Sequence, residues 1–182
     1  MKTFKTCLSL LAVAVVGTLV GCSTASTKAA SISDTLRAAL DQAGFKSVSI
    51  SQDRDKGVVT LGGHVTTDGD KSQAESIARS IAGTEVVANQ IAVLPVGVES
   101  DARAVNSDLD KGIESNLDAA LIADNLHDRV KYAVKNEVVT LTGEVRSQDK
   151  RARAATVAAA VPNVQQVVNE LQVKDQKATS TR

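Results

Sequence analysis

The hydrophobic positions of the chain form a pattern that occurs twice. The string VVTLGGHV at residues 58–65 returns 80 residues later as VVTLTGEV at residues 138–145. The same offset pairs matching residues over about forty positions, including Asn89 with Asn169. An internal repeat defines the structural unit, and two copies are too few for a solenoid. The sequence therefore predicts two small domains in tandem.

Within each copy, the spacing of apolar residues predicts the same five elements. Ile32, Leu36 and Leu40 recur at helical spacing, and alternating apolar residues on either side of a polar turn indicate a β-hairpin. A second helix is expected from about residue 68 to residue 83, and a third strand over residues 86–93. The second copy repeats this order, with its second helix expected over residues 149–161. The pattern predicts an α+β fold of two tandem αββαβ domains.

Gly63 and Gly143 occupy the same place near the end of the second strand of each copy. A residue without a side chain permits a β-bulge or a positive φ angle there. A phosphate-cradling loop is the functional alternative, but neither glycine lies in a GxGxxG or GxxxxGK[ST] pattern. Both are therefore expected to be structural glycines.

The N-terminus has the features of a bacterial export signal. Lys2 and Lys5 precede an uncharged apolar run at residues 8–16, which is too short to span a bilayer. The sequence LVGC at residues 19–22 resembles the lipobox, whose cysteine is acylated. An ordinary signal peptide is the alternative, but its cleavage site would favour a small residue where Leu19 stands.

We therefore expect a lipoprotein signal at residues 1–21, acylation of Cys22, and a flexible tether at residues 22–30. Cys7 would be removed with the signal, so the mature chain could form no disulfide. Aromatic residues are 2% of the chain and tryptophan is absent. Each unit of about 65 residues is small for one stable core, and we expect the two units to pack against each other.

The composition between and around the repeats sets the expected boundaries. The first domain is expected at residues 31–96 and the second at residues 111–174. Residues 97–110 are rich in Asp and Glu and are expected to form an acidic linker, of which residues 102–109 could extend the next helix. The polar tail occupies residues 175–182.

The motif V-V-T-L-x-G-x-V, followed by an alanine-patterned helix and V-x-N-x-[IL]-x-V, resembles the BON domain, and both copies carry it. With the lipobox in front, the whole chain is similar to dual-BON outer-membrane lipoproteins. The resemblance implies a small three-stranded mixed sheet covered on one side by two helices in each domain. It also implies phospholipid contact, a role in envelope integrity, and no catalysis.

Residues that could carry chemistry are few. His64 and His127 stand at non-equivalent places in the two copies, and neither has neighbours at metal-ligand spacing. No nucleophile elbow, Cys–His pair or paired carboxylates appear. We expect no enzyme activity, no cofactor and no metal. After signal removal, 19 basic and 21 acidic residues give a net charge of −2, which does not favour a nucleic-acid partner.

The start of the second helix differs in charge between the copies. The second copy carries four cations there: Arg146, Lys150, Arg151 and Arg153. Cations in a first helical turn oppose the helix dipole. One interpretation is that Asp149 caps this helix and the cations are solvated or paired with neighbours such as Glu144. The other is a basic edge that contacts anionic lipid head groups.

These features predict a non-catalytic lipoprotein, anchored in the outer membrane and facing the periplasm. Its second domain is expected to contact anionic phospholipid. The alternative is a lipid-anchored adaptor that recruits an envelope assembly or division protein. The sequence does not predict an oligomeric state.

Overall fold

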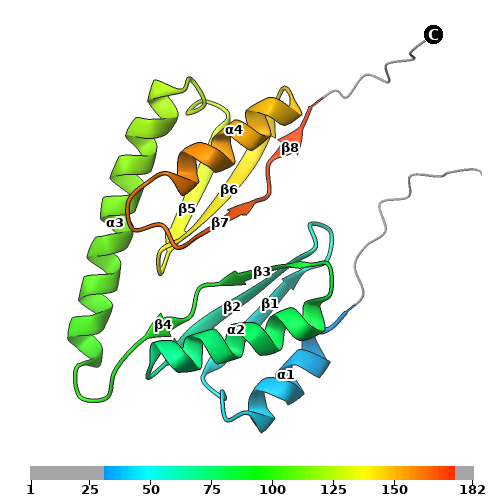
Figure 1. The fold of residues 1–182 in the computed structure, drawn as a ribbon, viewed down its shortest axis with the longest axis vertical. Coiled ribbons are helices and arrows are strands. Elements are labelled where there is room, and N and C mark those ends of the chain that lie inside the picture. The colour runs from blue at the N-terminus through cyan, green and yellow to red at the C-terminus, as the bar shows by residue number, and fades with distance from the viewer. Residues whose placement is uncertain (1–30, 175–182) are drawn as a thin grey trace, which may run out of the picture.

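The computed structural model describes residues 31–174, which form two domains of the same topology joined by a long helix (Figure 1). The first domain contains α1 (Ser33–Gln42), β1 (Val48–Asp53), β2 (Val58–Val65), α2 (Asp68–Ala82), β3 (Val86–Asn89) and β4 (Ala92–Val93). The second contains α3 (Glu99–Ala123), β5 (Val130–Lys135), β6 (Val138–Val145), α4 (Gln148–Ala159), β7 (Gln166–Asn169) and β8 (Gln172–Val173). The expected signal, acylated Cys22, tether and tail lie outside the described residues.

The central strand of each sheet is the one that carries the repeated string. Strand β2 pairs antiparallel with β1 and parallel with β3 and β4. Strand β6 pairs in the same way with β5, β7 and β8. Helices α1 and α2 pack on the first sheet, and α4 with the C-terminal part of α3 packs on the second (Figure 1). The predicted α+β fold of two αββαβ units is confirmed.

The third strand of each domain, expected to be continuous, is divided in two. The division follows from Asn89 and its counterpart Asn169. The Oδ1 atom of each accepts a hydrogen bond from the backbone N–H two residues later, at 3.4 and 3.2 Å. Their Nδ2 atoms donate to the carbonyls of Lys71 and Arg151, at 3.3 and 3.1 Å. Each asparagine therefore ties the interruption of the strand to the neighbouring helix.

Each domain has its own aliphatic core between the helices and the sheet. The fully buried leucines come in equivalent sets, Leu36, Leu40 and Leu61 in the first domain and Leu117, Leu121 and Leu141 in the second. Burial of a leucine side chain stabilises a fold by about 1.5 to 3 kcal/mol. The repeated sequence positions thus place the same side chains in both cores.

The two domains contact each other through a third apolar cluster. It consists of Val58 and Ala88 from the first domain and of Val138 and Val168, their counterparts in the repeat, from the second. Successive side chains of a strand alternate between its faces, so these residues lie on the side opposite to the helices. The expected packing of the two units is confirmed.

Polar bonds complete the contact between the domains. Gln166 of β7 accepts a hydrogen bond from the backbone N–H of Asn89 at 3.0 Å and donates to the carbonyl of Val87 at 2.6 Å. Its side chain thus pairs with the backbone of strand β3. Lys56 Nζ lies 2.5 Å from Glu170 Oε2, and the pair raises the pKa of Lys56. These bonds hold the two sheets in one relative orientation.

Helix α3 includes most of the expected acidic linker, and residues 102–109 extend the helix as the sequence analysis allowed. It has 25 residues and begins at Glu99. The carboxylate of Asp110 accepts hydrogen bonds from the N–H groups of Asn136 at 2.8 Å and Glu137 at 2.9 Å. These two residues form the β5–β6 turn with positive φ angles of 48° and 67°. The acidic stretch is therefore a helical part of the second domain, held against its hairpin.

Candidate functional site

Both domains have a pocket where their second helix begins. In the second domain a pocket of about 220 Å³ is lined by Asn125, Leu126, Arg129, Val145, Arg146 and Lys150. In the first, a pocket of about 320 Å³ is lined by residues that include Gly44, Phe45, Ser47, Val65, Thr66 and Asp70. In the strand register Val48 is paired with Gly63, and Val130 is paired with the equivalent Gly143. This register aligns the residues that line the first pocket with those that line the second. The two pockets are therefore the same place in the repeated fold.

The two pockets differ in charge. Three polar or acidic residues of the first pocket, Ser47, Thr66 and Asp70, are replaced in the second by the cations Arg129, Arg146 and Lys150. All three cations are exposed. Within residues 31–174, their side chains make no hydrogen bond or ion pair with another residue. Three unpaired charges of one sign around a pocket attract an anion.

Among the described residues, the acidic residues close to this cationic pocket in the sequence form no ion pair with its cations. Asp128 lies 3.7 Å from His127, and Glu144 lies 3.8 Å from Lys174 rather than pairing with the cations of α4. Asp149 stands in the first turn of α4, outside the set that lines the pocket. The charge of the pocket itself is therefore set by its three basic residues.

Gly143 allows the backbone of Arg129 to approach strand β6 closely beside the pocket. Its φ angle is 118°, and that of its counterpart Gly63 is 83°. A Cβ atom at Gly143 would lie 2.4 Å from the carbonyl oxygen of Arg129, and one at Gly63 would lie 2.1 Å from that of Ser47. Only glycine permits both this φ angle and this close approach. The two structural glycines thus support the pockets.

Ser147 fixes the start of α4 beside the cationic pocket. Its side chain accepts a hydrogen bond from the backbone N–H of Lys150 at 3.3 Å and so caps the helix. The expected cap, Asp149, lies inside the helix, so that expectation is corrected. The cap places Lys150 in the first turn, with Arg146 in the segment that leads into it.

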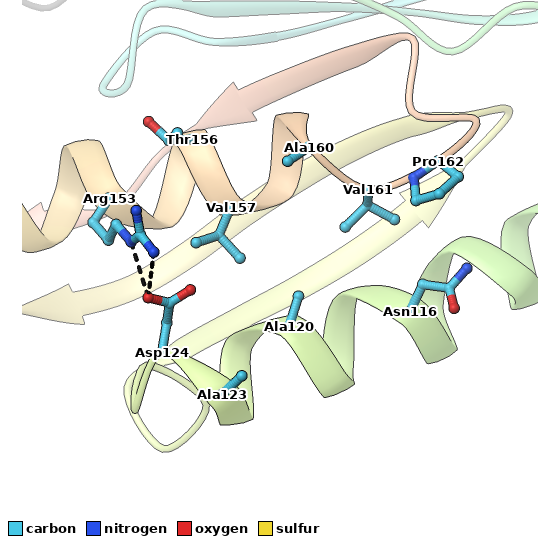
Figure 2. A pocket seen from close by; sticks show the side chains of 10 residues that line it. All are labelled: Asn116, Ala120, Ala123, Asp124, Arg153, Thr156, Val157, Ala160, Val161 and Pro162. Atoms are coloured by element: carbon cyan, nitrogen blue, oxygen red, sulfur yellow. Dashed lines mark hydrogen bonds and ion pairs between the residues drawn. The ribbon is translucent and has the colours of Figure 1, made fainter.

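Two of the four cations expected to form a lipid-binding set lie outside the pocket. Arg151 is half-buried, and its Nη2 atom donates to the carbonyl of Asn169 at 3.2 Å. Arg153 forms an ion pair with Asp124, with Nη2 2.7 Å from Oδ1 (Figure 2). The structure thus brings together Arg146 and Lys150, and it adds Arg129, which the sequence-based set lacks.

Other chemistry is sparse in the described part of the chain. Residues 31–174 contain no group of three or more His, Cys, Asp or Glu side chains arranged to hold a metal ion. His64 is exposed, and His127 Nε2 lies 2.9 Å from Asp118 Oδ1. Among the described helices, none combines the length and the apolar character that crossing a bilayer requires.

Comparison with known proteins agrees with this architecture. The BON domain matches residues 28–95 and 109–175, so the chain belongs to the BON-domain family. It is 32% identical over 139 residues to osmotically-inducible protein Y of Escherichia coli strain K12. That alignment covers 75% of this chain and 68% of the relative.

Two solved structures of CdsD, a structural protein of the type III secretion system of Chlamydia trachomatis, are also similar. The first has a TM-score of 0.36 and 14% identity, and the alignment covers 76% of this chain and 90% of that one. The second, of the C-terminal domain, has a TM-score of 0.33 and 14% identity over 77% of this chain and 96% of that one.

Proposed function

We propose that this BON-domain protein is a non-catalytic lipoprotein of the outer membrane that faces the periplasm. In this proposal it contacts anionic phospholipid through the cationic pocket of its second domain and supports envelope integrity. The observation that carries the proposal is the difference between two otherwise equivalent pockets. The second pocket has Arg129, Arg146 and Lys150 where the first has neutral or acidic residues.

The magnitude of the attraction supports a membrane role. A Lys or Arg near an anionic membrane contributes about 1 kcal/mol, so three contribute about 3 kcal/mol. Such an interaction is weak for a protein free in solution. It becomes effective when an acyl anchor, as expected at Cys22, keeps the domain close to the membrane. With no tryptophan in the chain, the contact should depend mainly on charge.

Salt dependence tests this proposal directly. The chain from Ser23 onward, produced without an acyl group, should co-sediment with vesicles that contain phosphatidylglycerol and should bind neutral phosphatidylcholine vesicles weakly. Because the Debye length shrinks from about 10 Å at 0.1 M salt to about 3 Å at 1 M, binding should fall by at least roughly tenfold over this range. Binding that is unaffected by salt, or equal for both lipids, would contradict an electrostatic contact.

A lipid-anchored adaptor that recruits an envelope assembly or division protein is the second candidate function. Exposed apolar residues before and within the first part of α3 favour it: Val96 is 82% exposed, and Val98 and Val105 are 48% and 57% exposed. In that case the chain from Ser23 onward should not bind anionic vesicles. Substitution of these valines by serine would then impair recruitment while leaving membrane attachment intact.

The proposed anchor makes a separate prediction. Cys22→Ala should abolish labelling by a fatty-acid analogue and should move the protein from the membrane fraction to the soluble fraction of the envelope, because several acyl chains together give lasting attachment. Cys7→Ala is the matched control and should leave both unchanged. Undiminished labelling of the Cys22→Ala protein would refute the lipoprotein assignment.

A further inference from the structure

An open apolar groove runs between α3 and α4 of the second domain (Figure 2). Its volume is about 460 Å³, within the range of about 300 to 1,000 Å³ that is typical of small-molecule sites. Small and aliphatic side chains from both helices form most of its walls: Ala120, Ala123, Val157, Ala160, Val161 and Pro162. Figure 2 shows Val157 and Val161 directed toward α3, and Ala120 directed toward α4. Such a surface fits a narrow hydrocarbon chain.

The repeat shows how the sequence opens this groove. The positions of Val157 and Val161 are occupied in α2 of the first domain by Ile77 and Ile81, which pack against the first core. Each isoleucine has one more methylene than valine. The position of Ala160 is occupied by Ser80. At these three positions the second domain therefore has less side-chain volume and only apolar side chains.

The groove adjoins the cationic pocket. Asp124 lines the groove and the next residue, Asn125, lines the pocket. On the facing helix, Arg153 lines the groove and Lys150, one turn earlier, lines the pocket. The two features that distinguish the second domain from the first thus lie end to end. A cationic end followed by an apolar groove is complementary to a phospholipid, which has an anionic phosphate followed by an acyl chain.

We propose that the groove holds one acyl chain of a phospholipid whose phosphate lies among Arg129, Arg146 and Lys150. The inference rests on the proposed function and deepens it, because the domain would bind a single lipid molecule as well as a charged surface. The ion pair of Asp124 and Arg153 lies at one end of the groove, away from Asn116 and Pro162 (Figure 2). With side chains 27% and 57% exposed, it is easily rearranged when a lipid enters.

Alkyl phosphates of increasing length separate the two parts of the site. Inorganic phosphate and butyl, hexyl and octyl phosphate, each below its micelle-forming concentration, are titrated into the chain from Ser23 onward and followed by NMR chemical shifts. Affinity should rise with chain length, by up to about fourfold for each fully buried methylene. Shifts should spread from the cationic pocket along the groove as the chain lengthens.

Two variants fill the groove without changing its charge. Ala160→Phe and Ala123→Phe, at exposed positions of α4's end and α3, should remove the dependence on chain length while leaving the affinity for inorganic phosphate within about twofold of the original. The matched control, Ser80→Phe, adds the same side chain at the equivalent position of the first domain and should keep the full dependence. Circular dichroism establishes which variants are folded.

The outcomes distinguish this inference from the proposed function. If octyl phosphate binds no more tightly than inorganic phosphate while anionic vesicles still bind, the acyl-chain site is wrong and the cationic contact stands. If the chain binds neither vesicles nor phosphates, both are wrong. If sedimentation shows that Ala160→Phe dissociates a dimer of this chain and chain length has no effect on affinity, the groove is a protein interface and the inference is overturned.

Discussion

Substitution of Gly143 by valine should lower the melting temperature of the second domain by roughly 10 to 20 °C. A non-glycine residue in an unfavourable backbone region costs about 1 to 3 kcal/mol, and each kcal/mol corresponds to about 4 to 8 °C in a domain of this size. The new Cβ atom would also lie 2.4 Å from the carbonyl oxygen of Arg129. Strand β6 and the loop before β5 would have to separate, which would also move Arg129 away from the pocket.

Tyr132 provides a measurement specific to this domain. It is the one tyrosine of the chain, it packs against the second core, and its hydroxyl lies 3.1 Å from Asp118 Oδ1. Its fluorescence should report unfolding of the second domain. Gly112→Val is the matched control, since a Cβ atom at Gly112 meets open space in α3. Equal melting temperatures for the Gly143→Val protein and the unmodified protein would mean that position 143 tolerates a side chain.

Reversal of the three pocket cations should weaken binding to anionic vesicles by more than a hundredfold. The triple variant Arg129→Glu, Arg146→Glu, Lys150→Glu loses about 3 kcal/mol of attraction, and a hundredfold change in binding corresponds to about 2.7 kcal/mol. The introduced carboxylates add repulsion. All three side chains are exposed and unpaired with other described residues, so the fold should remain intact. Co-sedimentation at 0.1 M salt measures the loss.

The first domain supplies matched controls for the reversal. The double variant Ser47→Glu, Thr66→Glu gives the first pocket three carboxylates, because Asp70 already lines it. It should reduce vesicle binding far less than the triple reversal in the second domain. The converse graft, Ser47→Arg, Thr66→Arg and Asp70→Lys in the triple variant, should restore most of the lost binding. Failure of the triple reversal to weaken binding, in a protein shown to be folded, would locate the lipid contact elsewhere.

The repeated hydrophobic pattern predicted the fold because the same residues form both cores. Leu61 and Leu141, or Val59 and Val139, stand at one repeat offset and are fully buried in both sheets. The interruption of the third strand could not be predicted from that pattern. It depends on hydrogen bonds of Asn89 and Asn169 to backbone groups, and apolar spacing carries no information about such bonds. The helical acidic stretch was missed in part because its bond to the β5–β6 turn joins residues distant in sequence.

The sequence predicted two of the three cations of the cationic pocket, because comparison of the two repeats draws attention to the start of α4. Lys150 was found because the repeat offset aligns it with Asp70, and Arg146 because it lies just upstream of the same helix. Arg129 was missed because the loop before β5 and the following turn differ in length between the copies. A fixed offset of 80 residues pairs Arg129 with Ser49, whereas the strand register pairs it with Ser47.

The two remaining cations were wrongly included in the predicted lipid-binding set. Arg151 and Arg153 were grouped with Lys150 because they are neighbours in the sequence. Successive residues of a helix point in different directions, at about 100° per residue. Arg151 consequently reaches the carbonyl of Asn169, and Arg153 reaches Asp124 on the facing helix. A helical wheel places Arg151 about 100° from Lys150 but Arg153 only about 60° from it, so only the fold shows that Arg153 contacts Asp124 and does not line the pocket.

The most direct test of lipid contact by the second domain is to map which part of the protein lies against the lipid. Isotope-labelled chain from Ser23 onward is mixed with nanodiscs that contain phosphatidylglycerol and a nitroxide-labelled head group, and the loss of each backbone amide signal is measured. Contact through the cationic pocket should give the strongest losses at residues 125–129 and 145–150, with the equivalent residues 44–47 and 65–70 of the first domain little affected. Losses centred on the first domain, or on the exposed valines at residues 96–105, would contradict it.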